Sequence, residues 1–342
     1  MKTRYPKPLK PGDTIAVTSP SSGVDESLQG RLDFAVDVLT NRGFTVELGK
    51  CMDGTKHISA PVAERAAELM AILLDPNIKA VIPPWGGETA IDLIPHLDFE
   101  VLATAEPTWF IGYSDISTLL APLTLRTGMA TLHGSNLMDT PYEIPETLMS
   151  WLEIAALPAG SSFRQSTPGV YRVNDWDDWA NSPTVTAHTW NGTGEWERLD
   201  AGGADIDVSG RLIGGCIETL VNLAGTPYLS TEHLGDHPGE PLIVYVEASG
   251  DDAATICRNL HGMRLAGFFE RAQAVLVGRT GAPDSPTLTQ TEAVIDALGV
   301  LGIPLIGNVE CGHVPPQLPI VNGALGRIVF TKAEQFLEQT LS

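Results

Sequence analysis

Basic residues are scarce in this sequence. Its 342 residues include 21 lysines and arginines against 42 aspartates and glutamates, which gives a formal net charge of −21. Binding to the phosphate backbone of nucleic acids, or to an anionic membrane surface, relies on clustered lysines and arginines. The composition therefore argues against both kinds of partner, and we attribute the acidity to solubility.

Cysteines are few and long apolar runs are missing. The four cysteines are scattered and form no CxxC pair: Cys51, Cys216, Cys257 and Cys311. This spacing predicts neither disulfides nor a structural zinc site, and it favours reduced thiols in a cytoplasmic protein. No run of about 18 apolar residues predicts a membrane span. Residues 1–6 precede no apolar segment of the kind that a secretory signal needs.

Cofactor signatures are absent as well. The sequence contains neither G-x-G-x-x-G nor G-x-x-x-x-G-K-[ST], so it predicts neither a dinucleotide site nor a P-loop. No group of histidines, aspartates and glutamates has the spacing of zinc ligands. We therefore expect no metal ion and no organic cofactor.

Short apolar segments alternate with helical patterns over residues 1–135. Candidate strands lie at 14–17, 44–48, 79–82 and 108–112, and candidate helices lie at 26–42, 61–74 and 88–95. Such alternation predicts an α/β fold with a doubly wound parallel sheet, in which ligands bind beyond the carboxyl ends of the strands. Three stretches fall at those ends: Ser19–Gly23, Trp85–Gly87 and Ser114.

The chain changes character after residue 140. Prolines and small residues accumulate between 140 and 168, which predicts a linker or an irregular crossing between two domains. Four of the seven tryptophans follow within 171–200, and they either pack over a small β-rich core or stack on a flat group of a ligand. Beyond residue 210, candidate strands at 241–246, 272–278, 304–308 and 326–330 alternate with candidate helices at 217–224, 253–266 and 289–298.

Ser114, Glu247 and His313 are polar residues at the ends of apolar segments. A serine hydroxyl needs a base to become a nucleophile at neutral pH, and a basic imidazole needs a carboxylate to fix its tautomer. These three side chains would supply that set. Each also has an ordinary structural explanation, as a helix cap, a solvated strand end and a loop residue. The segment lacks the full G-x-S-x-G motif of α/β-hydrolases, because Ile116 holds the last position.

Gly86 and Gly87 form a tight turn after the candidate strand at 79–82. A backbone N–H from this turn, together with the N–H of Asp115, would form an oxyanion hole beside Ser114. The alternative is a turn that only leads into the next helix.

Several segments, in order along nearly the whole chain, resemble the LD-carboxypeptidase family of serine peptidases (S66). Each segment alone is common, but the combination is specific: Leu9–Val17 with Pro20-Ser21, Glu64-Arg65-Ala66, Gly86-Gly87, Gly112-Tyr113-Ser114-Asp115, Gly214-Gly215, Gly225-Thr226-Pro227, Glu247 and Gly312-His313. The segment Pro84–Glu88 and the tryptophan-rich stretch resemble the branch that includes the microcin C immunity peptidases.

The resemblance implies a serine carboxypeptidase or amidase that works through an acyl-enzyme. Ser114 would be the nucleophile, His313 the base and Glu247 the acid that orients the base. The amides of Gly87 and Asp115 would form the oxyanion hole. The resemblance also implies a Rossmann-like nucleophile domain at 1–145, a linker and tryptophan-rich insert at 146–185, and a smaller β-rich domain at 186–342. Homodimers are usual in the family.

Two kinds of substrate follow from the resemblance: an aminoacyl- or peptidyl-nucleotide cut at its amide bond, or an L,D-linked muropeptide that loses D-alanine. The residues expected to contact substrate are Trp85, Gly86, Trp176, Trp179, Trp190 and Cys216. Two positions depart from the family. Cys216 stands where asparagine is common, and Asp251 stands where nucleotide-cleaving members place a basic residue. A carboxylate at that position would repel a phosphate.

Two functions of other kinds stay open. An α/β chain with a cleft could bind a peptide-nucleotide without cutting it, although the presence of all three triad residues speaks against this. A glutamine-amidotransferase-like enzyme would need a cysteine at the turn from strand to helix, where this chain has Ser114.

Overall fold

A six-stranded sheet organises the amino-terminal part of the chain in the computed structural model, which describes residues 1–173, 176–200 and 202–342. Its strands are β1 (Thr14–Val17), β2 (Thr45–Leu48), β3 (Ile78–Val81), β4 (Trp109–Gly112), β5 (Thr131–His133) and β14 (Ile320–Asn322). The first five are parallel in the order β2-β1-β3-β4-β5, and β14 pairs with β5 in the antiparallel sense. The order reverses between β1 and β3, so the expected doubly wound sheet is confirmed.

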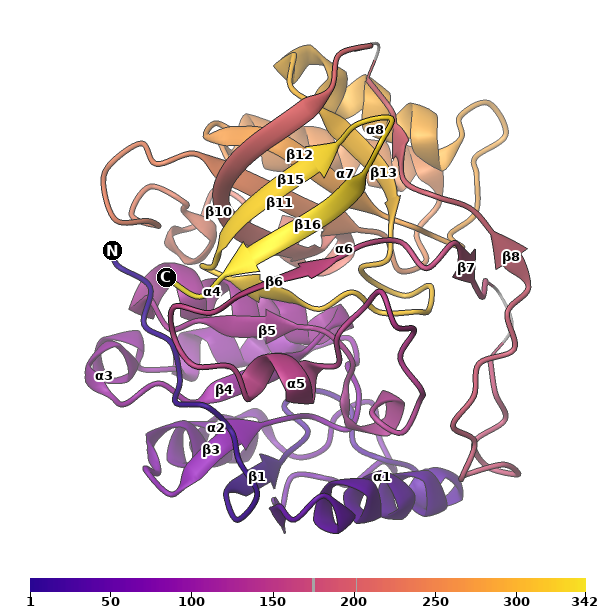
Figure 1. Ribbon diagram of the computed structural model, residues 1–342. Coiled ribbons are helices and arrows are strands. Elements are labelled where there is room, and N and C mark those ends of the chain that lie inside the picture. The colour runs from indigo at the N-terminus through magenta and orange to yellow at the C-terminus, as the bar shows by residue number, and fades with distance from the viewer. Residues whose placement is uncertain (174–175, 201) are drawn as a thin grey trace.

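Helices cover both faces of this sheet (Figure 1). They are α1 (Gln29–Asn41), α2 (Val62–Leu74), α3 (Phe99–Thr104) and α4 (Ser117–Thr127). The segment expected to be helical at 88–95 is a 3₁₀ helix, Ala90–His96, that contains Pro95. Proline lacks the N–H that a regular α-helix would use there. The short helix α3 was not expected, because six residues are too few to show a clear helical period.

The strands of the first sheet are buried on both faces, as parallel sheets usually are. On β4, Phe110 packs into one core together with α2 and α4. Its neighbours Trp109 and Ile111 point the other way, into a second core that includes residues of α1. All three side chains have no exposed surface. This double burial explains why the strand is a continuous apolar run in the sequence.

An eight-stranded sheet organises the second part of the chain. Its strands are β6 (Ser162–Gln165), β9 (Glu197–Arg198), β10 (Ile206–Cys216), β11 (Leu242–Glu247), β12 (Ala272–Gly278), β13 (Leu305–Val309), β15 (Leu325–Phe330) and β16 (Gln335–Thr340). They lie in the order β6-β16-β15-β10-β11-β12-β13-β9. The neighbours from β10 to β13 are parallel, and the outer pairs are antiparallel. The second domain is thus rich in β-structure. Its parallel strands, β10 to β13, are connected through helices, as in an α/β fold.

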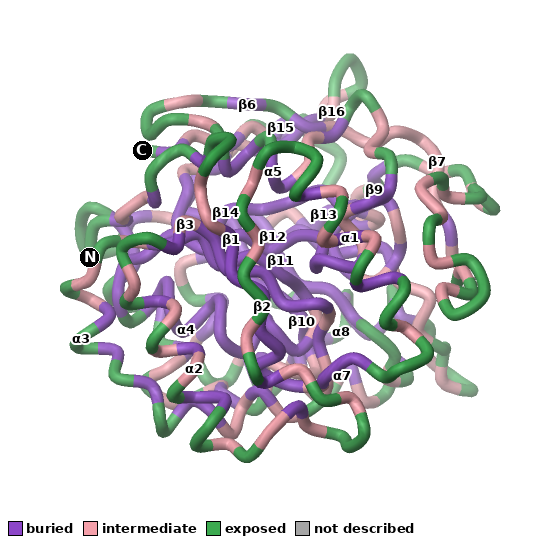
Figure 2. The backbone as a smooth tube through the Cα atoms, turned by 90° about the horizontal axis from the view of Figure 1, so that it is seen from below, coloured by how far each residue is buried: buried purple, intermediate pink, exposed green. Residues whose placement is uncertain are grey.

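The remaining elements complete the second part and the connection to it. These are α5 (Trp151–Ala155), α6 (Ile217–Leu220), α7 (Ala253–Leu265), α8 (Gln290–Leu298) and the small ribbon of β7 (Val170–Tyr171) and β8 (Gly192–Thr193). The ribbon lies at the edge of the molecule in Figure 2, where exposed and half-buried residues predominate. None of the helices in the described part of the chain has the length and apolar character needed to cross a bilayer.

Helix α4 joins the two sheets into one structure. Of its eleven residues, Arg126 is the one that is not buried. Leu119, Leu120 and Leu123 share a core with Ile213 of β10 and Val244 of β11. Figure 1 shows α4 between the purple first sheet and the orange and yellow second sheet. The residue that starts the turn into α4 therefore lies at the junction of the two domains.

Candidate active site

Ser114 follows β4 at a sharp turn. Its φ angle is +63°, in the left-handed region that residues other than glycine rarely adopt. A 3₁₀ turn, Ser114–Ile116, leads directly into α4. Tyr113 holds the cap position of this turn, and no side chain caps it. The simple role of Ser114 as a helix cap is therefore not what the structure shows.

The structure brings Ser114, His313 and Glu247 into one hydrogen-bonded line. The Oγ of Ser114 lies 2.9 Å from Nε2 of His313, and Nδ1 of the same ring lies 2.8 Å from Oε2 of Glu247. Because the carboxylate can only accept, Nδ1 carries the ring proton and donates it. Nε2 is then the acceptor for the serine hydroxyl.

Glycines allow this line to form. His313 lies in the connection from β13 in the second sheet to β14 in the first, so both sheets hold the loop. A Cβ on Gly312 would lie 2.5 Å from Oε2 of Glu247, and a Cβ on Gly278 would lie 2.6 Å from Cβ of Glu247. Either contact is too short for a side chain. The two glycines therefore leave room for the carboxylate beneath the imidazole.

Burial and charge act in opposite directions on the acid and the base. Burial alone would raise the pKa of Glu247, but the charge and hydrogen bond of His313 outweigh it and hold this pKa below its usual value. Burial alone would lower the pKa of His313, but the carboxylates of Glu247, Glu218 and Asp139 outweigh it and raise this pKa above 6.5. Glu247 is thus ionised at neutral pH, and it stabilises the imidazolium that proton transfer creates.

Aromatic rings pack against the imidazole of His313 and against one another. The ring of Tyr113 meets His313 edge-on, with centroids 5.0 Å apart, and it also meets His133 at 6.4 Å. His133 in turn meets Tyr245 at 5.1 Å. Burial lowers the pKa of His133 to about 4, so this ring is neutral at physiological pH. The aromatic side chains that pack near His313 therefore carry no charge.

The loops after β1, β3 and β4 meet beside Ser114, as the sheet order requires. A Cβ on Gly86 would lie 2.9 Å from Cβ of Ser114 and 3.1 Å from the backbone nitrogen of Asp115. The Asp115 carboxylate accepts hydrogen bonds from Oγ of Ser21 at 2.6 Å and from the N–H of Ala90 at 2.8 Å. Gly86 therefore lies directly beside the serine, and the following Gly87 packs against Ser21 and Ser22.

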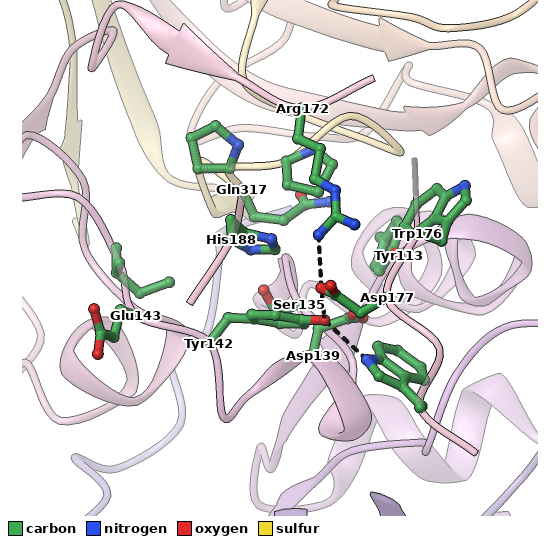
Figure 3. Close-up of a pocket in the computed structure, with 14 residues that line it drawn as sticks. Tyr113, Ser135, Asp139, Tyr142, Glu143, Arg172, Trp176, Asp177, His188 and Gln317 are labelled. Atoms are coloured by element: carbon green, nitrogen blue, oxygen red, sulfur yellow. Dashed lines mark hydrogen bonds and ion pairs between the residues drawn. The ribbon is translucent and has the colours of Figure 1, made fainter. Parts of the chain in front are cut away.

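A pocket opens next to Tyr113 and to the loop that follows His313. It encloses about 600 Å³ of unfilled space, counting the part open to solvent. Figure 3 shows aromatic and charged side chains converging on it. The lining residues are Tyr113, Ser135, Asp139, Tyr142, Glu143, Ile144, Arg172, Trp176, Asp177, Trp179, His188, Pro315, Pro316 and Gln317.

The aromatic part of this pocket is held by a network that sequence reasoning missed. The rings of Tyr142 and His188 are stacked with centroids 3.9 Å apart. Asp177 accepts hydrogen bonds from the Tyr142 hydroxyl and from Arg172, both at 2.6 Å (Figure 3). Buried Arg31 of α1 lies over the Tyr142 ring at 4.8 Å. Arg31, Tyr142 and the residues between 172 and 188 come from separate parts of the sequence, so no local pattern could have indicated their contacts.

The expected tryptophans divide into two groups. Trp176, which is 60% exposed, and Trp179 line the pocket. The indole N–H of Trp179 donates to the Tyr142 hydroxyl at 2.8 Å. Trp190 is not among the lining residues, and its ring lies 5.1 Å from that of His188. Trp176 therefore offers the most accessible face for a flat ligand.

The other two side chains expected to contact substrate have internal partners. Trp85 donates its indole N–H to the carbonyls of Ser22 at 3.2 Å and Gly23 at 3.0 Å. Cys216 is buried, pairs with Glu247 across β10 and β11, and directs its thiol at Glu218. Neither side chain lines the pocket.

Glu218 fills a ring of backbone donors beside Glu247. Its Oε1 accepts three N–H groups, from Ser249 at 2.7 Å, Gly250 at 3.0 Å and Asp251 at 3.2 Å. Consecutive N–H groups of this kind form a site for an anion. The chain occupies that site with its own carboxylate, which adds negative charge near His313.

Known proteins resemble this chain over most of its length. The LD-carboxypeptidase N-terminal domain profile matches residues 15–134, and the C-terminal domain profile matches residues 209–328. The microcin C7 self-immunity protein MccF of Escherichia coli is 27% identical over 349 residues, which covers 98% of this chain and 96% of MccF. The murein tetrapeptide carboxypeptidase of Pseudomonas aeruginosa is 29% identical and covers 87% of each chain.

Solved structures show the same fold. MccF in complex with aspartyl sulfamoyl adenosine superposes with a TM-score of 0.83 at 24% identity, covering 98% of both chains. An MccF-like protein from Bacillus anthracis gives a TM-score of 0.80 at 23% identity. The two profiles, taken with full-length relatives and a shared two-domain fold, lead to one conclusion: the chain belongs to the LD-carboxypeptidase family, Peptidase S66.

Proposed function

We propose that this protein is a serine-type amidase or carboxypeptidase that cuts a C-terminal amide bond through an acyl-enzyme. The observation that carries the proposal is the line of hydrogen bonds from Ser114 through His313 to Glu247, at 2.9 and 2.8 Å. A nucleophile, a base and an acid in contact are what acyl transfer requires. A protein that only binds its ligand does not need these three groups to be aligned. The positive φ angle of Ser114 lowers stability, and such strain is typical of active sites.

The first half of the reaction forms the acyl-enzyme. Nε2 of His313 takes the proton of the Ser114 hydroxyl while Oγ bonds to the carbonyl carbon of the substrate. The carbonyl oxygen becomes an oxyanion, which the backbone N–H groups of Gly87 and Asp115 stabilise in the proposed hole. His313 then gives its proton to the leaving nitrogen, and the amide bond breaks.

The second half releases the acid. A water molecule gives a proton to Nε2 of His313, and its oxygen bonds to the acyl carbon. The second tetrahedral intermediate collapses when His313 returns the proton to Oγ of Ser114. Throughout, Glu247 holds the proton on Nδ1 and stabilises the imidazolium.

For the leaving group we propose a flat, nucleoside-type ring system. Stacking of a base on an aromatic side chain contributes about 1–3 kcal/mol to the free energy of binding. The pocket next to Tyr113 is lined by four such side chains: Tyr142, Trp176, Trp179 and His188. MccF has been solved in complex with aspartyl sulfamoyl adenosine and with glutamyl sulfamoyl guanosine, which supports this choice.

For the acyl group we propose a neutral or cationic residue rather than an acidic one. The three backbone N–H groups of Ser249–Asp251 already donate to the carboxylate of Glu218, so they are not free to bind a carboxylate of the substrate. Glu247 and Asp139 add negative charge around His313. Like charges repel more strongly in a partly buried site than in water.

One assay separates these possibilities. The purified protein is offered lysyl- and aspartyl-sulfamoyl adenosine and an L,D-linked tetrapeptide, and products are identified by mass spectrometry. We expect cleavage of the lysyl compound above the aspartyl one. Release of D-alanine alone would instead favour the murein carboxypeptidase that the Pseudomonas aeruginosa relative represents. Tight binding of intact compounds without product would favour a non-catalytic binder.

The family resemblance also leads us to propose a homodimer in the cytoplasm. Light scattering on the purified protein measures the mass directly, and a value near the 36.5 kDa of one chain would contradict the dimer.

A further inference from the structure

Helices α7 and α8 bring three metal-binding side chains together, although their spacing in the sequence suggested no zinc site. Cys257 and His261 lie four residues apart on α7, so they share one face of the helix. Asp296 faces them from α8. The two helices are neighbours in both views of the molecule (Figures 1 and 2).

The ligand atoms are already close to the geometry of a metal site. One ligand atom from each of Cys257, His261 and Asp296 lies within 4.8 Å of the other two. Nε2 of His261 is 2.7 Å from Oδ1 of Asp296, and Sγ of Cys257 is 3.5 Å from the same oxygen. Zinc bonds of about 2.0–2.3 Å require ligand atoms roughly 3–4 Å apart. We expect side-chain rotations, rather than a movement of the helices, to supply the difference.

We propose that Cys257, His261 and Asp296 form a zinc site that clamps α7 to α8. Thiolate sulfur and imidazole nitrogen suit Zn²⁺, whereas Mg²⁺ and Ca²⁺ require oxygen ligands. On binding, the Cys257 thiol releases its proton to solvent, and His261 stays neutral with its proton on Nδ1. The thiolate and the carboxylate of Asp296 then balance the two positive charges, and water takes the fourth position.

Solvent can reach this group. The side chain of His261 is 35% exposed and that of Asp296 is 62% exposed, while Cys257 is half-buried. None of the three lines the pocket beside the proposed nucleophile. Zinc would therefore act on the stability of this helix pair and not on the chemistry at Ser114.

The positive charge of Arg264 opposes binding of the ion. Its Nη2 donates to Nδ1 of His261 at 3.2 Å, so the ring proton now lies on Nε2. Zinc at Nε2 moves that proton to Nδ1, and Arg264 must then turn away. Arg264→Gln removes the opposing charge and offers a carbonyl that accepts the Nδ1 proton. Such outer partners change metal affinity by about 10–100-fold, so we expect this variant to bind zinc about tenfold more tightly.

The test is calorimetric titration of the metal-free, full-length protein with zinc chloride. We expect one ion per chain. Cys257→Ser and His261→Asn should each weaken binding by more than about 100-fold, because a direct ligand is worth more than an outer partner. His233→Asn is the matched control, since His233 is an exposed histidine elsewhere on the surface, and it should bind as the wild type does.

Two further measurements make the result decisive. Titration with Co²⁺ should produce a sulfur-to-metal charge-transfer band that Cys257→Ser abolishes. Zinc should raise the melting temperature of the wild type and not that of Cys257→Ser, because an ion that binds the folded state stabilises it. Absence of saturable zinc binding would overturn the proposal, as would binding that both ligand variants retain. Either outcome leaves the proposed hydrolase function unaffected.

Discussion

Ser114 shows how a single residue can be placed for chemistry at the expense of local stability. Its φ of +63° costs of the order of 1–3 kcal/mol, which the buried helix α4 and the sheet around it offset. In this conformation the Ser114 hydroxyl lies 2.9 Å from Nε2 of His313.

We predict that Ser114→Ala lowers kcat/KM by several orders of magnitude while the protein stays folded. The substitution removes the proposed nucleophile but no core contact, and removal of such a residue costs about 10⁴–10⁶-fold in comparable enzymes. Steady-state kinetics and circular dichroism measure the two effects. Ser230→Ala, at an exposed serine, is the control. Wild-type turnover in the Ser114 variant would remove this residue from the mechanism.

We predict that kcat/KM rises with pH and reaches half its maximum above pH 6.5. His313 must be neutral to accept the proton of Ser114, and the nearby carboxylates of Glu247, Glu218 and Asp139 raise its pKa above 6.5. The raised pKa also means that the charged imidazole stabilises the fold fully below pH 6.5, and that this contribution is lost as the pH rises through the raised value. A rate profile with its midpoint below 6.5 would contradict this assignment.

At the scale of elements, the turn at Ser249–Asp251 holds one of the carboxylates that act on the base. Its three N–H groups hold Glu218, whose carboxylate contributes to the raised pKa of His313. Glu218→Gln keeps an oxygen for the same N–H groups but removes the charge. We predict that the acidic limb of the rate profile moves to lower pH. Glu334→Gln, at an exposed site between β15 and β16, should leave the profile in place.

The tryptophan-rich segment offers a matched pair for testing the pocket. Trp176 lines the pocket and is 60% exposed, whereas Trp190 is not a lining residue. If the leaving group stacks on an exposed indole, Trp176→Ala should raise KM about 5–150-fold with little change in kcat, since stacking is worth about 1–3 kcal/mol. Trp190→Ala should change KM much less. Equal effects of the two variants on KM would argue against stacking on Trp176.

At the scale of the whole molecule, the relay depends on two sheets that share one core. Leu120 of α4 and Val244 of β11 belong to the same buried cluster, and β14 returns from the second part of the chain to complete the first sheet. The division into 1–145, 146–185 and 186–342 remains a prediction about sequence regions, because these parts are tied together by the core.

We predict that the protein unfolds in one cooperative transition. Leu120→Ala leaves a cavity between the sheets and should lower the free energy of unfolding by about 2–5 kcal/mol without splitting that transition. Calorimetry, compared with near-ultraviolet circular dichroism, measures both. Two separate transitions in the wild type would mean that the domains are independent, and that the shared core contributes little.

Much of the fold and part of the site follow from sequence patterns. The apolar runs at β1, β3 and β4 and the helical patterns between them predicted the doubly wound sheet, and the sheet predicted which loops would meet. Ser114 and the Gly86-Gly87 turn were found this way. The pattern was weaker for β6 and β16, which lie at one edge of the second sheet and were not expected.

The sequence by itself determined which residues lie at strand ends. A strand that is buried on both faces is a continuous apolar run, so its end can be located from the sequence. It did not determine which distant residues would touch. The network of Arg31, Tyr142 and Asp177, and the group of Cys257, His261 and Asp296, exist only because separate elements pack side by side. Such contacts are decided by tertiary structure, since their energy depends on distances in space that no spacing along the chain records.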